Sequence, residues 1–387
     1  MTRRARRRGR LYGAAVLGCA LGATREASAE PKVSPEGYVE AYVAWNTNRP
    51  SNAVTNARGF DDRHATFSLS NAVLGARAEL GPVTTRLLLQ VGSTPTSYYA
   101  AEPRRAGGTA SGATDANLWK YVQTATIAWQ ATSKLKVEGG IFLSPIGVEQ
   151  MAVKDNFTYS RSNLFFGLPF YHTGLRAAYA LSDAFEVGLA AYNGWNSVVD
   201  NNEEKSLVPS VTWKTKQSQV QLLYFGGVER AAGAAEGRPW RHTFDLVATY
   251  DAASWLSLQA QGDVGFEETR MGTSSWAAVA LAARYKLASF LYLAGRVDRF
   301  GETVASDGTL AAAPIFWSGS PWVSSQTVTL DARPVEQLSV RLEVRRDASG
   351  RELYYRGQVS GTGEADAPYV PNARTQSTVL LGATAWF

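Results

Sequence analysis

Histidine and serine residues could together catalyse hydrolysis, because a serine activated by a histidine base is the nucleophile of many hydrolases. The chain contains three histidines, His64, His172 and His242. No nucleophile motif lies near His172, and Ser160 and Ser162 lack the glycine-flanked turn that presents a catalytic serine. The pattern favours structural histidines that are hydrogen-bonded within a wall or rim, so we predict no catalytic residue and no enzyme.

Metal and phosphate chemistry has equally little support. One cysteine, Cys19, and three histidines do not suffice for a cysteine-rich or multi-histidine metal centre. The pairs Gly107-Gly108 and Gly226-Gly227 lack the following lysine and serine of a phosphate-binding loop. The acidic run at 200–204 could bind divalent cations, but such runs are more often solvated loops. We therefore predict no metal and no cofactor.

The first 29 residues resemble an export signal. They contain seven arginines and one acid, and the apolar stretch 11–23 follows the arginine-rich start. The small residues Ala27-Ser28-Ala29 suit signal peptidase, and the apolar stretch is too short to cross a bilayer comfortably. We predict cleavage of residues 1–29, which leaves 30–387 as a single domain without cysteine. An uncleaved membrane anchor is the alternative.

The net charge has to be divided before it is interpreted. The whole chain has 39 basic and 34 acidic residues, which gives a formal charge of +5. Without residues 1–29, seven fewer bases leave 32 and one fewer acid leaves 33, so the remainder carries −1. The basic character therefore belongs to the export signal and does not indicate nucleic-acid binding.

Alternation of apolar and polar residues dominates the rest of the chain. In 338–345, Leu, Val, Leu and Val alternate with Ser, Arg, Glu and Arg. This period of two is typical of a strand with two different faces, and it recurs at 135–141, 185–189, 256–261 and 291–298. The sequence therefore predicts an all-β protein.

A soluble β-sandwich also alternates, but three features favour a membrane barrel. Many alternating segments reach about ten residues, the length that crosses a bilayer at a tilt. Full charges recur on the polar face, and tight turns alternate with much longer links, as in outer-membrane barrels. A helical membrane protein is excluded, since the most apolar window, 276–295, contains Arg284 and Lys286.

Seven tight turns define fourteen strands, and one strand at each end brings the total to sixteen. We expect a transmembrane antiparallel up-and-down β-barrel with short periplasmic turns and long outer loops; fourteen strands is the alternative. The predicted spans are 37–46, 65–80, 83–92, 118–130, 133–143, 167–181, 184–195, 205–214, 217–228, 241–251, 254–267, 274–286, 289–299, 324–333, 337–346 and 375–387.

Charged residues on the polar faces should line an aqueous lumen. Seven bases and seven acids balance, so we expect weak ion selectivity; Arg333, Arg341 and Arg345 could add a local preference for anions. The predicted pore-lining residues are Arg86, Lys136, Glu138, Glu186, Asp245, Asp263, Arg284, Arg296, Asp298, Asp331, Arg333, Arg341, Glu343 and Arg345.

The third outer link, 144–166, mixes charged and aromatic residues. It carries Glu149, Lys154, Asp155 and Arg161 among several phenylalanines and tyrosines. We expect this link to fold into the lumen and to form a constriction whose charges select ions. The alternative is a solvated loop packed on the rim.

The last strand ends in an aromatic residue. Phe387 shares one apolar face with Ala385, Ala383, Leu381 and Val379. A terminal aromatic that closes an alternating strand resembles the signal read by the outer-membrane assembly machinery. We therefore interpret Phe387 as an assembly signal.

Several short motifs, densest in 37–215, resemble the OmpL-like β-barrel porin family of Gram-negative bacteria; the C-terminal half matches mainly by pattern. Each motif is weakly specific, and their order is more so. The motifs are Gly37-Tyr38, Asn48-Arg49-Pro50, Gly140-Ile141-Phe142, Ser144-Pro145-Ile146-Gly147-Val148-Glu149, Asn156, Ser160-Arg161-Ser162, Pro169, His172-Thr173-Gly174, Asn193-Gly194-Trp195 and Asp200-Asn201-Asn202.

The resemblance implies an outer-membrane pore and supplies no catalytic residues. With the barrel pattern, it leads us to expect a passive diffusion porin for small hydrophilic solutes and ions in the outer membrane of a Gram-negative bacterium. Its partners would be outer-membrane lipid, lipopolysaccharide, the assembly machinery and the permeating solutes, with no nucleic acid. The alternative is a non-conducting adhesin or surface scaffold.

Overall fold

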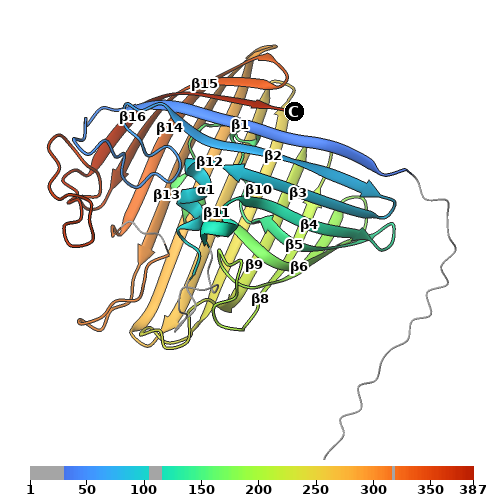
Figure 1. The fold of residues 1–387 in the computed structure, drawn as a ribbon, viewed down its shortest axis with the longest axis horizontal. Coiled ribbons are helices and arrows are strands. Elements are labelled where there is room, and N and C mark those ends of the chain that lie inside the picture. The colour runs from blue at the N-terminus through green and yellow to red at the C-terminus, as the bar shows by residue number, and fades with distance from the viewer. Residues whose placement is uncertain (1–29, 104–115, 316–318) are drawn as a thin grey trace, which may run out of the picture.

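A computed structural model describes residues 30–103, 116–315 and 319–387 of the chain. The predicted signal peptide, 1–29, lies outside these residues. The described chain forms one closed barrel of sixteen strands, and each strand is antiparallel to its neighbours (Figure 1). The predicted fold class and the count of sixteen strands are confirmed.

The strands follow one another around the barrel in chain order. Their bounds are β1 Lys32–Asn46, β2 Ser68–Leu80, β3 Val83–Val91, β4 Val122–Gln130, β5 Leu135–Leu143, β6 Tyr171–Ala180, β7 Phe185–Tyr192, β8 Ser206–Lys214, β9 Ser218–Val228, β10 Trp240–Ala253, β11 Leu256–Thr269, β12 Gly272–Ala288, β13 Leu291–Thr303, β14 Trp322–Val335, β15 Leu338–Ser349 and β16 Thr375–Trp386.

The first and last strands close the sheet. β1 pairs with β16 in a continuous register from Tyr38 opposite Trp386 to Asn46 opposite Thr378. Closure leaves none of the described strands as a free edge, which a sheet within a bilayer requires because lipid tails accept no hydrogen bonds.

Side chains alternate between the two faces of the wall. On β15, Leu342 and Val344 are 48% and 52% exposed, whereas Arg341, Glu343 and Arg345 are each 1% exposed. The apolar side chains therefore cover the outside of the barrel and the ionised ones point inward, as the alternation in the sequence predicts.

The wall is uneven in height. Strands β3 to β8 have 8–10 residues each, whereas β10 to β12 have 14–17. Several predicted boundaries are wrong by four or five residues. β1 begins at Lys32 instead of 37, β4 at Val122 instead of 118 and β6 at Tyr171 instead of 167, while β13 ends at Thr303 instead of 299. Only 270–271 separate β11 from β12, although the predicted spans left 268–273 between them.

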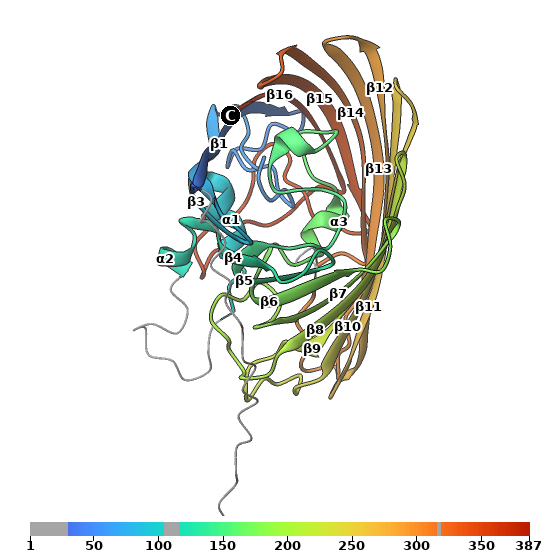
Figure 2. The same cartoon turned by 90° about the vertical axis from the view of Figure 1, so that its right-hand side faces the viewer.

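Short helices occur only in links between strands. They are α1 Ser93–Tyr99, α2 Ala116–Trp119, η1 Val153–Asp155 and α3 Asn163–Phe166. None of the helices in the described ranges has the length and apolar character needed to cross a bilayer. Figure 2 shows α3 within the ring of strands, where it contacts β12, β13 and β14.

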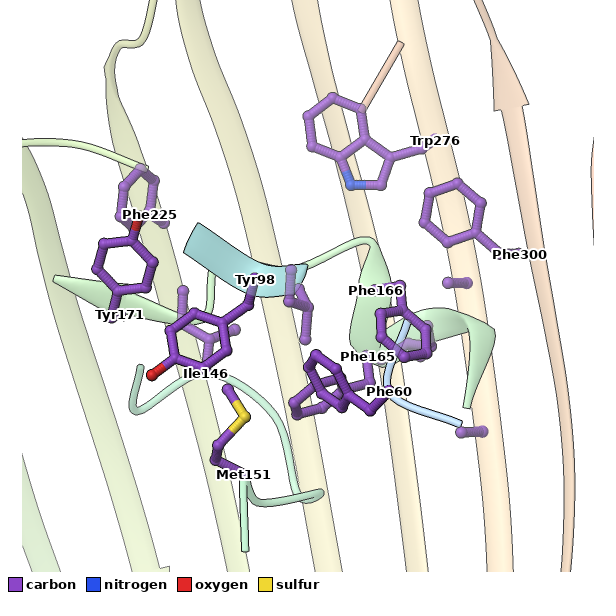
Figure 3. Close-up of a cluster of buried hydrophobic side chains, with 14 of the residues drawn as sticks. Phe60, Tyr98, Ile146, Met151, Phe165, Phe166, Tyr171, Phe225, Trp276 and Phe300 are labelled. Atoms are coloured by element: carbon purple, nitrogen blue, oxygen red, sulfur yellow. The ribbon is translucent and has the colours of Figure 1, made fainter. Parts of the chain in front are cut away.

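An aromatic cluster forms the largest buried core. Phe60, from the link after β1, lies 5.2 Å from Phe166 and 6.4 Å from Tyr98, measured between ring centroids (Figure 3). Trp276 and Phe300 belong to the same cluster and come from the long strands β12 and β13. Links from distant parts of the sequence thus pack together against the inner wall.

Candidate functional site: the inner wall and the segment 144–166

The segment 144–166 begins its contact with the long strands through backbone groups. The Gly147 amide donates to Asp245 Oδ2 at 3.3 Å, and the Val148 amide donates to Gln261 Oε1 at 2.9 Å. Gln261 also donates to Asp245 at 2.8 Å and contacts Asp263. Two predicted pore-lining carboxyls, Asp245 and Asp263, therefore lie buried beneath the start of the segment.

Glu343 on β15 holds the middle of the segment. Its carboxylate accepts from the Tyr159 amide at 2.6 Å and from the Ser160 amide at 3.1 Å. The Thr329 hydroxyl on β14 donates to the same carboxylate at 2.8 Å. Hydrogen bonds to an ionised acceptor are stronger than neutral ones, so this buried carboxylate is a strong anchor.

Two arginines of β15 bind carbonyl groups of the same segment. Arg341 donates to the carbonyls of Thr158 at 2.8 Å and Asn156 at 2.9 Å, and Arg345 donates to the carbonyl of Arg161. Carboxylates thus bind amide hydrogens while guanidinium groups bind carbonyl oxygens. Together they satisfy the backbone of an irregular segment that is buried away from water.

A third group of contacts, made by β13, fixes Glu149 near the start of the segment and Asn163 near its end. Arg296 on β13 forms an ion pair of 2.6 Å with Glu149. Asp298, two residues further on, accepts from the Asn163 amide at 3.1 Å and from its side chain at 2.8 Å. The Ser162 hydroxyl caps α3 by accepting from the Phe165 amide at 3.1 Å.

The four predicted constriction residues separate into two kinds. Glu149 and Arg161 are largely buried, and Arg161 donates to the Tyr159 carbonyl at 2.9 Å while its guanidinium lies 5.4 Å from the Phe60 ring. Lys154 and Asp155 pair with each other at 2.8 Å and are more exposed. Only this second pair offers accessible charge.

Two cavities lie on the opposite side of the segment, mainly along β1 to β9. The first has a volume of about 490 Å³ and is lined by Arg86, Tyr38 and the Lys154–Asp155 pair, among others. The second has a volume of about 430 Å³ and is lined by residues of β4 to β9. Glu138 and Arg176 line both, so one ion pair stands between the two spaces.

Ion pairs organise the charges around these cavities. Arg86 on β3 lies 2.7 Å from Glu36 on β1, and Arg176 on β6 lies 2.6 Å from Glu138 on β5. Lys136 is about half exposed and lies 3.9 Å from Glu138. The accessible wall therefore presents paired charges of both signs.

All fourteen predicted pore-lining residues alternate with outward apolar residues and so lie on the inner face. Six of them are at least partly exposed: Arg86, Lys136, Glu138, Glu186, Arg284 and Arg333. The other eight are buried by protein: Asp245, Asp263, Arg296, Asp298, Asp331, Arg341, Glu343 and Arg345. Arg341 and Arg345 in particular present almost no charge to a solute.

Several further charges lie on the same face but were not predicted from the sequence. Glu36 and Arg176 form ion pairs at the cavities, and Glu40 accepts from the Val153 amide at 2.6 Å. Arg58 binds Asp347 at 3.1 Å. Glu36 and Asp347 lie just outside the predicted strands. Glu40 and Arg176 lie within predicted strands, at positions whose spacing along the strand also places them on the inner face.

A buried glutamate joins two other links. Glu102, after α1, accepts from the Tyr171 hydroxyl at 2.6 Å and from the Val198 amide at 2.9 Å. Burial raises the pKa of Glu102 above its ordinary value, although these two donors oppose the shift. Figure 3 places Tyr171 beside Phe225, on the side of the aromatic cluster nearer the short strands.

His172 makes contacts that give it a structural role. His172 is fully buried, stacks on Tyr192 with 4.3 Å between ring centroids, and lies 3.0 Å from the Gly194 carbonyl. Ser144 Oγ lies 3.1 Å from its other ring nitrogen, so a hydroxyl and a carbonyl, rather than a carboxylate, are the partners found for this ring among the described residues. Within the described residues, no group of three or more potential ligands could hold a metal ion.

The family comparison decides what kind of barrel this is. The family model described as "Putative beta-barrel porin-2, OmpL-like" matches residues 32–387. The chain belongs to this family. It is therefore an outer-membrane β-barrel porin of a Gram-negative bacterium, and the resemblance noted in its sequence is confirmed. No curated protein matches the chain significantly.

Solved porin structures share the fold. An anion-selective porin from Comamonas acidovorans has a TM-score of 0.58 at 12% identity, over 92% of this chain and 100% of that one. OprB of Pseudomonas putida has 0.59 at 14%, over 92% and 94%. The outer-membrane channel DcaP of Acinetobacter baumannii has 0.55 at 12%, over 92% and 97%. At these identities the likeness concerns the fold alone.

Proposed function

We propose that this porin is a passive diffusion channel for small hydrophilic solutes and ions. The observation that supports this proposal most directly is the asymmetry of the lumen. Hydrogen bonds and ion pairs bind the segment 144–166 to β10–β15, while cavities of about 490 and 430 Å³ lie on its other side, mainly along β1 to β9. Solutes would pass between the segment and β1 to β9, with the segment acting as a fixed constriction.

Buried and exposed charges have different roles in this proposal. The buried group on β10 to β15 holds the segment and does not meet the solute. The exposed charges at the cavities are of both signs in nearly equal number, and most of them form ion pairs. This mixture favours weak overall ion selectivity. The exposed charges are Glu36, Arg86, Lys134, Lys136, Glu138, Lys154, Asp155, Arg176 and Glu186, five bases and four acids.

The proposal includes the maturation of the chain. Cleavage of residues 1–29 would release 30–387 as a single barrel domain without a catalytic role. Phe387 would serve as the signal for the outer-membrane assembly machinery; its side chain is 64% exposed and its backbone pairs with Gly37 at the seam. Outer-membrane lipid and lipopolysaccharide would surround the barrel.

Cysteine accessibility tests the proposed route. Cys19 is the only cysteine and belongs to the predicted signal peptide, so the mature chain offers no competing thiol. Gln150 and Ser210 line the first and second cavity, and Ser339 and Thr329 are buried on the long strands. We expect charged methanethiosulfonate reagents to reduce the conductance of Q150C and S210C but not of S339C or T329C.

The opposite pattern of block would refute the route. If S339C and T329C are blocked while Q150C and S210C are not, solutes pass along the long strands. A heat-modifiability gel shift establishes for each variant that the barrel is folded.

One observation favours the second candidate, a non-conducting adhesin or surface scaffold. The aromatic cluster that includes Phe60, Tyr98 and Phe166 occupies space inside the ring of strands (Figure 3). A barrel obstructed by this cluster would conduct little. Planar-bilayer recording separates the candidates, because a folded barrel without conductance would favour the scaffold.

A further inference from the structure

The outer face of the barrel carries two positive charges where apolar residues are the rule. Among the outward-facing positions of the described strands, Arg299 on β13 and Arg346 on β15 are the basic ones, and both are exposed. Neither forms an ion pair within the described part of the chain. No outward-facing position on β12 to β16 carries an acid that could pair with them.

Strand register brings these arginines into one patch. Arg299 lies opposite Ser324, and Arg346 lies opposite Gln326, both on β14 between them. Two strand spacings and a two-residue offset place the arginine Cα atoms about 12 Å apart. Gln326 is exposed between them, and Ser377 on β16 faces Arg346 from the other side.

An aromatic ring supports one of the arginines. The Arg299 guanidinium lies 4.4 Å from the centroid of the Trp322 ring, a cation–π contact. Tryptophan favours the boundary between lipid tails and water, where its apolar body and polar edge are both accommodated. The contact therefore indicates that the patch lies at the level of lipid headgroups.

The apolar band of the wall ends at this patch. Val297 and Val344 are the last exposed apolar residues before Arg299 and Arg346. On β14, which runs in the opposite direction, Val328 is the exposed apolar residue next to Gln326 on the side of the apolar band. The patch lies toward the end with the long links, which in an outer-membrane barrel faces the outside of the cell. Lipid of the outer leaflet would thus place its headgroup on the arginines and its acyl chains on the valines.

Electrostatics selects the chemistry of the ligand. An arginine facing lipid is destabilising by an amount that decreases from the bilayer midplane to the interface. A phosphate removes this penalty, because guanidinium binds it through two parallel hydrogen bonds. We propose that Arg299, Gln326 and Arg346 form an external site for the phosphate groups of an outer-leaflet lipid.

Binding of phosphorylated lipid A to the purified, detergent-solubilised protein tests the site by native mass spectrometry. We expect R299Q/R346Q to bind this lipid roughly thirtyfold more weakly than the wild type, because the variant loses the attraction of two interfacial arginines to the lipid phosphates. R299K/R346K should retain part of the affinity, because lysine binds phosphate as a point charge. The control K214Q alters an exposed lysine of β8 at the short-turn end and should bind normally.

Several outcomes would overturn the site. The double glutamine variant could bind phosphorylated lipid A as tightly as the wild type, or the wild type could bind dephosphorylated lipid A equally well, which would indicate apolar contacts alone. Competition by inorganic phosphate at similar concentration would indicate a small-anion site. A changed oligomeric state of R299Q/R346Q in light scattering would instead assign the patch to a protein interface.

The result is independent of the proposed channel function. The arginines lie on the outside of the wall, so R299Q/R346Q should keep the wild-type conductance in planar bilayers. Loss of lipid binding with unchanged conductance supports the site, and absence of conductance in both proteins would refute only the channel.

Discussion

Glu343 is the residue whose change should release the segment 144–166 with the least effect on the barrel. E343Q keeps the shape of the side chain but removes its charge and half of its accepting capacity. The wild-type carboxylate accepts from the amides of Tyr159 and Ser160 at 2.6 and 3.1 Å and from the Thr329 hydroxyl at 2.8 Å. The amide group of glutamine cannot accept all three.

The expected loss follows from these contacts. Hydrogen bonds to a charged group contribute about 1.5–3 kcal/mol each, and an unpaired buried donor adds its desolvation cost. Losing the equivalent of one to two such bonds destabilises the anchored segment by about 3 kcal/mol, which raises the released fraction roughly 150-fold.

Hydrogen–deuterium exchange measures this equilibrium directly. The amides of Tyr159 and Ser160 should exchange roughly 150-fold faster in E343Q than in the wild type. Amides of β10 to β15 should keep their protection. E186Q is the matched control, since Glu186 lines the second cavity and takes part in none of the hydrogen bonds and ion pairs that hold the segment. Unchanged exchange at Tyr159 and Ser160 in folded E343Q would refute the anchoring role.

Three further predictions concern charges elsewhere. R176Q removes the 2.6 Å partner of Glu138, so the reversal potential in a salt gradient should shift toward cation preference; no shift would place the pair off the permeation route. Because burial raises the pKa of Glu102, the wild type should lose stability relative to E102Q as the pH rises above the ordinary 4.5, and an unchanged difference in Tm contradicts this. The backbone hydrogen bond from the Leu310 amide is the largest of the effects that lower the pKa of Asp307 to about 2. The ionised Asp307 carboxylate should therefore stabilise the turn that contains it above pH 3.8, and this stabilisation should be lost as the pH falls toward 2. A titration of the Asp307 carboxyl carbon by NMR with its midpoint at 3.8 would disprove that.

The barrel could be predicted because its pattern is local. In 338–345 each residue reveals its face by alternating with its neighbours, and the structure places Arg341 inward and Leu342 outward accordingly. Errors occur where alternation weakens. Pro35 interrupts the pattern near the start of β1, so the first residues of that strand and Glu36 were missed, and Asp347 lies one residue beyond the predicted end of β15.

The division of the inner charges could not be predicted in the same way. Whether an inward arginine meets water or protein depends on partners far away in the sequence. Ser160 and Glu343 are 183 positions apart, and Gly147 and Asp245 are 98 apart. The alternation of a strand contains no information about such partners. The composition of 144–166 indicated an unusual link, but the side of the wall that it binds is a property of the closed barrel.

Single-channel recording of the purified protein in a planar bilayer tests the central claim most directly. A diffusion channel predicts stepwise, ohmic conductance with a permeability ratio for cations and anions close to one, as expected from paired charges around the cavities. A preparation that shows the gel shift of a folded barrel yet gives no conductance steps would contradict the account.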